Sequence, residues 1–179
     1  MPRLLSVFSL VAALVLAACA PTQPVRMGAD GRPVPQVYNI SDPDAVRFRM
    51  EDALNTMRQA RGLPRVSLNA SLNAAAERHA RDMSRQERPW HFGSDGSSPL
   101  ERVARAGYRG TMVGETVSET FENELQTLNA WMEDRVTRTV LTNPRARDMG
   151  LGFHQDPNGK LWWTLVLGDP RAEQRVPTS

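Results

Sequence analysis

The sequence contains a single cysteine and has little net charge, and these two shortages exclude several classes of protein. One cysteine in 179 residues excludes an intramolecular disulfide, so an exported fold would depend on its hydrophobic core alone. Lysine occurs once among the 22 basic residues, and the 21 arginines are scattered along the chain beside 20 acidic residues. Because the net charge is only +2 and no basic stretch is concentrated, nucleic acid is not expected as a partner.

Long hydrophobic runs are also rare, and the longest lies near the N-terminus. Leu4–Ala18 is an almost unbroken apolar run of 15 residues that follows the basic Arg3. This run is short for a membrane span but has the length of a signal-peptide core. It ends in Leu16-Ala17-Ala18-Cys19, which resembles the lipobox of bacterial lipoproteins. The resemblance implies that residues 1–18 are a signal peptide and that Cys19 is lipidated; the alternative is an ordinary secretory signal with an incidental cysteine.

The expected location follows from this N-terminus. A lipoprotein carries two or three acyl chains, palmitate among them, which would anchor it durably to a membrane without crossing it. Ala20 stands where aspartate signals inner-membrane retention in some bacteria, which favours the outer membrane or the periplasmic side of the cell envelope. Residues 19–43 contain five prolines and few apolar residues, so we expect a Pro-rich tether after the lipidated cysteine. Residues 169–179 are expected to form a disordered tail.

Residues 44–168 have the patterns of one folded domain. Apolar residues at helical spacing predict four helices, which begin near Asp44, Asn69, Ser98 and Glu122. Strand-like runs cover residues 111–117, 148–154 and 161–167. The turn sequence Asp156-Pro157-Asn158-Gly159 between the last two runs predicts a hairpin. This order of elements predicts an α+β fold in which helices pack on a small antiparallel sheet.

A series of short motifs in this region occurs in a recognisable order. The motifs are Leu72-x-x-Ala75-x-x-x-His79-Ala80-x-Asp82-Met83, the segment 90–99, Arg102, Ala106-Gly107-Tyr108, Gly114-Glu115, Trp131-Met132, Asn143-Pro144, Gly150-Leu151-Gly152 and Trp162-Trp163-Thr164. Together they resemble the bacterial branch of the CAP superfamily of cysteine-rich secretory proteins, antigen 5 and pathogenesis-related 1, whose domain is also called the SCP domain. The resemblance covers residues 44–168 and implies an α-β-α sandwich, with the antiparallel sheet between two helical layers.

The resemblance also implies a site. In that family a central cleft commonly holds two histidines and two acidic residues, and some members bind a divalent metal such as zinc there. His91, which opens a His-x-Gly-x-Asp-Gly stretch, and Glu115, which follows glycine, match two of these positions. Thr137 replaces the usual second histidine, and Asp134 stands where serine is usual. A metal site of His91 and Glu115 would therefore need Asp134 or His79 as a further ligand.

The chemistry of these side chains leaves two roles open for the candidate cleft. A carboxylate that accepts a hydrogen bond from an imidazole fixes the tautomer of the ring. His91 and Glu115 would therefore form either a functional polar pair or a contact that only holds the loop 88–97 on the sheet. His79 lies on the apolar side of its predicted helix, where a packed histidine with one hydrogen-bonded ring nitrogen is expected.

Two further features concern the surface and catalysis. Adjacent residues of a strand point to opposite faces, so one of Trp162 and Trp163 is a candidate for exposure. The sequence has no Gly-x-Ser-x-Gly elbow, and Ser98 is assigned as a helix cap, so serine catalysis is not expected. Cysteine catalysis is not expected either, because the only thiol would be acylated.

We therefore expect a non-catalytic binding or scaffolding module anchored at the cell envelope. Its partner would be an envelope protein, a lipid or a cell-wall component, and the sequence assigns it neither a catalytic residue nor a definite cofactor. Two alternatives stay open. One is a metal-assisted hydrolase that acts on peptide or peptidoglycan through His91 and Glu115, and the other is a carrier that binds lipid in an apolar groove.

Overall fold

The computed structural model describes residues 38–120 and 122–171. The predicted signal peptide, Cys19 and most of the predicted tether and tail lie outside the described residues. Within the described ranges, no helix combines the length and the apolar character that a membrane span requires. The helices are α1 (Pro43–Gln59), α2 (Ala70–Gln86), α3 (Pro99–Arg105), α4 (Glu124–Glu133) and α5 (Arg135–Leu141), and the strands are β1 (Ser67–Leu68), β2 (Thr111–Thr120), β3 (Asp148–Gln155) and β4 (Leu161–Asp169).

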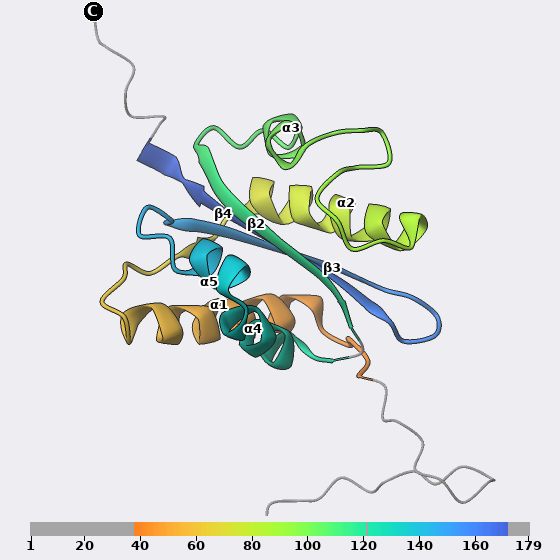
Figure 1. Cartoon of the computed structure of the whole chain (residues 1–179), viewed down its shortest axis with the longest axis horizontal. Helices are drawn as coiled ribbons and strands as arrows, with labels where there is room; N and C mark the ends of the chain where they lie inside the picture. Colours follow the sequence, from red (N-terminus) through yellow and green to blue (C-terminus); the bar gives the residue numbers. More distant parts are fainter. Residues whose placement is uncertain (1–37, 121, 172–179) are drawn as a thin grey trace, which may run out of the picture. The chain divides into compact units, whose positions relative to one another are not determined.

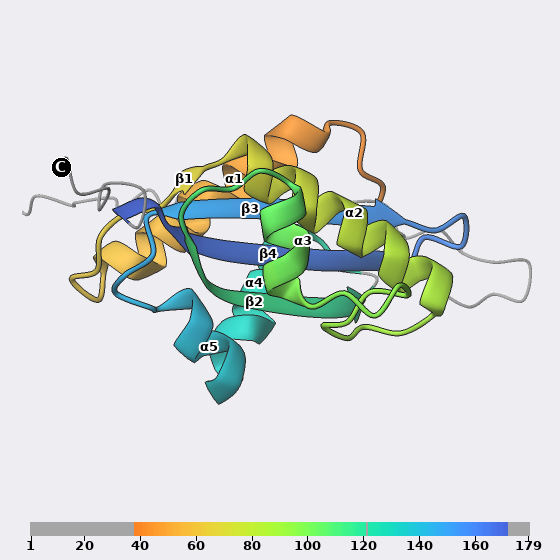
Figure 2. The same cartoon turned by 90° about the horizontal axis from the view of Figure 1, so that it is seen from above.

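A four-stranded sheet lies between two layers of helices (Figures 1 and 2). Its strands follow the order β1-β3-β4-β2, and β4 is antiparallel to both β3 and β2. Helices α2 and α3 cover one face of the sheet, and α1, α4 and α5 cover the other (Figure 1). The α+β class and the α-β-α layers that the sequence predicts are therefore confirmed.

The sheet is mixed rather than wholly antiparallel, which corrects the expectation from the sequence. The two-residue strand β1 runs parallel to β3 and pairs Ser67 with Asp148. The backbone N–H of Ser67 donates to the carbonyl oxygen of Arg147 at 2.8 Å. A segment this short carries no alternation that a sequence pattern can detect. Its pairing arises because the connection from α1 to α2 passes along the edge of β3.

Strand β4 lies at the centre of the core, because helices cover both faces of the sheet. Every residue of Leu161–Asp169 is buried. Trp162 packs with Ala80 and Met83 of α2, whereas Trp163 belongs to the larger cluster that includes residues of α1 and α4. Neither tryptophan is exposed, so the expectation that one of them reaches the surface is wrong. The two side chains do point to opposite faces, but each face has its own helical layer.

Local sequence signals set the beginnings of the helices that position the site. The Asn69 side chain accepts hydrogen bonds from two backbone N–H groups in the first turn of α2, as expected of an N-cap. Ser98 and Glu101 form the predicted capping box at the start of α3, with a proline at its first position. These caps fix where α2 and α3 begin, and with them the loop that joins the two helices.

The folded domain begins a few residues before the predicted boundary. The Tyr38 hydroxyl donates to Glu124 of α4 at 2.8 Å, and the Gln155 side chain bonds backbone groups of Tyr38 and Ile40. Arg49 of α1 forms an ion pair with the same Glu124 at 2.5 Å. The end of the predicted tether thus contacts α4 and the end of β3. At the other end, β4 extends one residue beyond the predicted boundary at residue 168.

A buried arginine joins α1 to the segment that follows α5. Arg58 is fully buried and donates hydrogen bonds to the carbonyl oxygens of Pro64, Leu141, Asn143 and Ala146 at 2.7–3.3 Å. Burial lowers the pKa of this guanidinium below its usual range. Because a guanidinium keeps its proton in proteins, the carbonyl oxygens compensate a permanent buried charge.

Two glycines allow α2 to pack directly on β3. A Cβ added at Gly150 would lie 2.2 Å from the backbone carbon of Leu72, and one added at Gly152 would lie 2.1 Å from that of Ala76. Neither distance is possible without moving the helix away from the strand. The close approach of the two backbones therefore accounts for the Gly-x-Gly motif of β3.

We predict that Gly152→Ala lowers the free energy of unfolding of the full chain by about 3 kcal/mol, because α2 and β3 must separate. Gly62→Ala is the matched control. Gly62 has a φ of +67° with nothing within 4 Å, so this variant should cost only about 1–2 kcal/mol of backbone strain. Urea denaturation followed by circular dichroism measures both costs. A cost for Gly152→Ala no larger than that of the control would contradict this explanation of the motif.

Candidate functional site

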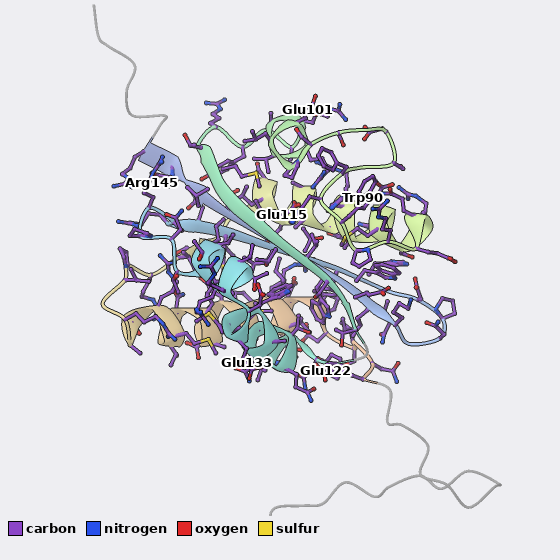
Figure 3. The ribbon with its side chains drawn as sticks, in the orientation of Figure 1. Trp90, Glu101, Glu115, Glu122, Glu133 and Arg145 are labelled. Atoms are coloured by element: carbon purple, nitrogen blue, oxygen red, sulfur yellow. The ribbon has the colours of Figure 1, made fainter. Side chains whose placement is uncertain are left out.

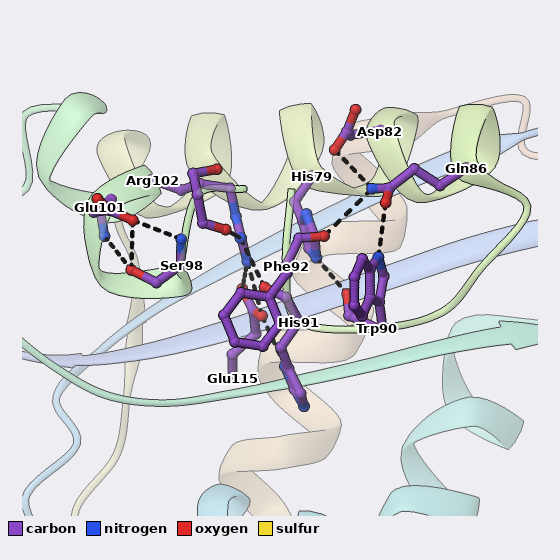
Figure 4. Close-up of polar contacts among 11 residues, drawn as sticks. His79, Asp82, Gln86, Trp90, His91, Phe92, Ser98, Glu101, Arg102 and Glu115 are labelled. Atoms are coloured by element: carbon purple, nitrogen blue, oxygen red, sulfur yellow. Dashed lines mark hydrogen bonds and ion pairs between the residues drawn. The ribbon is translucent and has the colours of Figure 1, made fainter. Parts of the chain in front are cut away.

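A buried carboxylate lies at the centre of the candidate site. Glu115 lies near the middle of β2, opposite Val166 of β4, and its side chain is 3% exposed (Figure 3). The side chain is directed toward the layer of α2 and α3, where its hydrogen-bond partners lie (Figure 4). A charged carboxylate at this depth destabilises the fold unless opposite charge and hydrogen-bond donors surround it.

Arg102 of α3 supplies the opposite charge. Its Nη2 donates to both carboxylate oxygens of Glu115 at 2.9 Å (Figure 4). Its Nη1 donates to the carbonyl oxygens of His91 and Ser97, at 2.8 and 3.0 Å. One guanidinium therefore joins β2 to two points of the loop between α2 and α3. The Arg102 side chain is itself only 10% exposed, so water screens this ion pair little.

His91 is the second partner of Glu115. Its Nδ1 lies 2.9 Å from Oε1 of Glu115, so the two residues that the sequence pairs are in contact. Because Glu115 accepts from a guanidinium as a carboxylate, Nδ1 of His91 is the donor, and in the neutral ring Nε2 carries no proton. The His91 side chain is half exposed. The contact therefore fixes one tautomer of a ring that solvent can reach.

The end of α2 holds the loop 88–97 from the other side. Asp82 accepts hydrogen bonds from the backbone N–H of Ser94 at 2.7 Å and from its hydroxyl at 2.6 Å. Gln86 accepts from the Trp90 indole N–H at 2.8 Å and donates to Asp82 at 2.9 Å (Figure 4). Burial opposes the ionisation of Asp82, but hydrogen bonds, with those from Ser94 foremost, outweigh it and lower the pKa of Asp82. The loop is thus held by side chains of α2 on one side and by Arg102 of α3 on the other.

His79 lies in a different environment from His91. It is fully buried, and its Nε2 donates to the carbonyl oxygen of Trp90 at 2.8 Å (Figure 4). Burial lowers the pKa of His79, so the ring is neutral at pH 7 and its Nδ1 is an acceptor. Within the described part of the chain, Nδ1 has no hydrogen-bond partner. His79 therefore has the packed position that its place on the helix predicts, and it supports the loop.

Asp134 and Thr137 lie at the junction of α4 and α5. Asp134 is the N-cap of α5, and its Oδ1 accepts from the backbone N–H groups of Val136 and Thr137 at 2.9 Å. The hydrogen bond from the Thr137 backbone is the main cause that lowers the pKa of Asp134. The Thr137 hydroxyl donates to the carbonyl oxygen of Trp131 at 2.5 Å. The side chains at these two positions therefore stabilise the helix junction.

The residues present do not fit the metal centre that the family resemblance allows. Within residues 38–120 and 122–171, no group of three or more His, Cys, Asp or Glu side chains is placed to hold a metal ion. Both oxygens of Glu115 accept from Arg102, while Asp134 caps a helix and His79 bonds a loop carbonyl. His91 and Glu115 are thus brought together, but neither Asp134 nor His79 joins them as a third ligand.

Sequence reasoning gave no role to the two residues that organise the site, Arg102 and Asp82. Both occur within the family motifs, but an isolated charged residue on a helix usually faces solvent. One signal was available for Arg102, since it lies four residues after the Ser98 cap and therefore on the same side of α3. That spacing directs Arg102 back toward the loop that precedes the helix.

The fold and this arrangement define the class of protein. The model of the cysteine-rich secretory protein family, CAP, matches residues 51–167, and the chain belongs to this family. A comparison with curated protein sequences finds no match.

Solved structures with the same fold come from several bacteria. An outer surface protein from Borrelia burgdorferi has a TM-score of 0.62 at 14% identity, over 72% of this chain and 95% of that chain. An extracellular SCP-domain protein from Bacillus anthracis has a TM-score of 0.63 at 17% identity, over 74% of this chain and 45% of that chain. A cysteine-rich secretory protein from Staphylococcus aureus has a TM-score of 0.59 at 17% identity, over 73% of this chain and 40% of that chain. The chain spans less than half the length of the latter two proteins.

We predict that Arg102→Met lowers the free energy of unfolding by about 3–5 kcal/mol, because it leaves the Glu115 carboxylate buried without a cation. Adding Glu115→Leu to this variant should restore much of the loss, since no buried charge is then left. Arg105→Met is the matched control. It breaks an ion pair with Asp95 whose side chains are more than half exposed, and should cost less than about 1 kcal/mol. Equal costs for Arg102→Met and Arg105→Met in urea denaturation would contradict the structural role of Arg102.

Proposed function

We propose that the protein is a lipid-anchored, non-catalytic binding module of a bacterial cell envelope, and that the loop 88–97 contacts another envelope component. The observation that carries this proposal is the bonding of Glu115, whose two oxygens accept from Arg102 and one of them also from His91. In this arrangement the family's cleft carboxylate supports a loop. It is not free to act as a base or to bind a metal.

The loop presents a preformed surface. Phe92 is 48% exposed, and its ring lies 5.6 Å from that of Trp90. The guanidinium of Arg88 lies 4.0 Å above the Trp90 ring. Aromatic and arginine side chains are enriched at the energetic centres of protein interfaces. Because Asp82 and Gln86 already hold this loop, binding would require little further ordering.

The proposed location rests on the sequence before the described residues. The segment Leu16-Ala17-Ala18-Cys19 has the form of a lipobox, and the prolines after it would separate the domain from the membrane surface. Two of the structurally similar proteins are named as an outer surface protein and an extracellular protein. These names support a position outside the cytoplasm for this chain as well.

One observation favours a second candidate function, hydrolysis of peptide or peptidoglycan. With Nδ1 bonded to Glu115, the half-exposed ring of His91 leaves Nε2 without a partner among the described residues, and in the neutral ring this nitrogen is an acceptor. A histidine oriented by a carboxylate in this way is a common general base. A water molecule would have to act as the nucleophile, and groups of the substrate would have to supply the rest of the chemistry.

For the anchor, we predict that the chain expressed in a bacterium with lipoprotein-processing enzymes requires detergent for extraction and carries acyl chains by intact mass. Cys19→Ala should abolish the acylation, because the thiol is the acceptor group. Ala20→Asp keeps the thiol and serves as the control that stays acylated. A wild-type protein that is water-soluble and unacylated would exclude the anchor.

For the binding surface, we predict that a photoreactive amino acid in place of Phe92 gives discrete cross-linked products in intact cells. The matched control is the same substitution at Phe48 of α1, which is 61% exposed and lies outside the loop, and it should give none of these products. Purified cell-wall polymer incubated with the wild-type chain should release no fragments. Release of fragments that disappears with His91→Ala would instead support the hydrolase.

A further inference from the structure

A cavity of about 340 Å³ lies between α2, α3 and the loop that joins them. Its volume is in the range of sites that bind small molecules. It is separate from the pair described above, because neither His91 nor Glu115 lines it. All of its lining residues are polar or charged, and the charged ones include Arg78, Asp82 and Arg85 of α2, Asp95 of the loop and Arg105 of α3.

The carboxylates in this lining already have hydrogen-bond partners. Asp82 accepts four hydrogen bonds, two on each oxygen. Asp95 accepts from the backbone N–H of Ser97 at 2.9 Å on one oxygen and from Arg105 at 2.6 Å on the other. Hydrogen bonds from Ser97, followed by that from Arg105, hold the pKa of Asp95 far below its usual range. A ligand that donates hydrogen bonds would therefore find these acceptors occupied.

The guanidinium groups, by contrast, have unused donors. Each guanidinium carries five N–H donors, and Arg85 and Arg105 each use one nitrogen in the bond to their carboxylate. Arg78 is exposed, and it has no hydrogen bond or ion pair with any residue in the described ranges. Among the described residues, the guanidinium of Arg78 therefore has no ion-pair partner, whereas that of Arg102 is paired with Glu115.

We infer that this cavity binds an oxyanion, a carboxylate or phosphate group of a small molecule, through Arg78, Arg85 and Arg105. Arg78 and Arg85 are seven residues apart, which places them on one side of α2 two turns apart. Arg105 approaches from α3 across the loop. Guanidinium groups bind the paired oxygens of carboxylates and phosphates with good geometry. The site is additional to the surface around Phe92 on which the proposed function rests.

The test is a titration of the full chain in detergent with sodium phosphate and, separately, with sodium acetate, at an ionic strength kept constant with chloride. Isothermal calorimetry gives the affinity of each anion. Arg78→Gln should weaken the binding at least about tenfold, because a charge-assisted hydrogen bond is lost. Arg61→Gln is the matched control, an exposed arginine that does not line the cavity, and it should leave the affinity unchanged.

Asp95→Asn provides a change in the opposite direction. The amide can still accept from the backbone of Ser97, but it no longer neutralises Arg105, so the affinity for the anion should rise several-fold. If Asp95 only stabilised this turn, Asp95→Asn would not tighten the binding of the anion.

Saturable binding of phosphate, of acetate or of both that responds to Arg78→Gln supports the site, and the tighter anion identifies the preferred group. No saturable binding of either anion, or equal weakening by Arg78→Gln and Arg61→Gln, would overturn it. These measurements need neither the lipid anchor nor an envelope partner. A negative titration therefore leaves the proposed function to be decided by the cross-linking and anchoring experiments. Failure of those experiments likewise leaves the anion site to be decided by the titration.

Discussion

The burial of the Glu115 carboxylate is the constraint on which the site depends. A carboxylate that is 3% exposed requires a cation, and Arg102 provides it with two hydrogen bonds of 2.9 Å. The remaining donors of Arg102 reach the carbonyl oxygens of His91 and Ser97. Strand β2, helix α3 and the loop before α3 are therefore fixed by the same guanidinium. The half-exposed ring of His91 acquires its orientation as a consequence.

The abundant arginines, which by number alone indicate nothing about function, have at least three distinct roles. Arg58 is fully buried and compensated by backbone carbonyl oxygens, so it joins segments far apart in the sequence. Arg102 neutralises a buried carboxylate within the domain. Arg78 has no partner among the described residues and lines a polar cavity. The burial of an arginine side chain and its hydrogen-bond partners, rather than the residue type, determine whether it stabilises the fold or is available to a ligand.

Much of the fold could be predicted because its signals are local. The Asn69 cap, the capping box of Ser98 and the turn sequence before Gly159 each act within a few residues, and each stands where the sequence places it. Strand β1 and helix α5 could not be predicted in the same way. The first has two residues and pairs with a distant strand. The second follows α4 directly, and Asp134, which caps it, gave no recognised signal of a new helix.

The sequence by itself determined the α+β class through local periodicity, and the family resemblance through motifs in a fixed order. That resemblance made His91 and Glu115 candidates for one site, and the structure brings them into contact. Only the tertiary structure decided what surrounds that pair. It brought Arg102 to both oxygens of Glu115 and engaged Asp134 in a helix cap, and it covered Trp162 and Trp163 on opposite faces of one sheet. Burial and hydrogen-bond partners arise from segments that are distant in sequence, and no local pattern records which segments will meet.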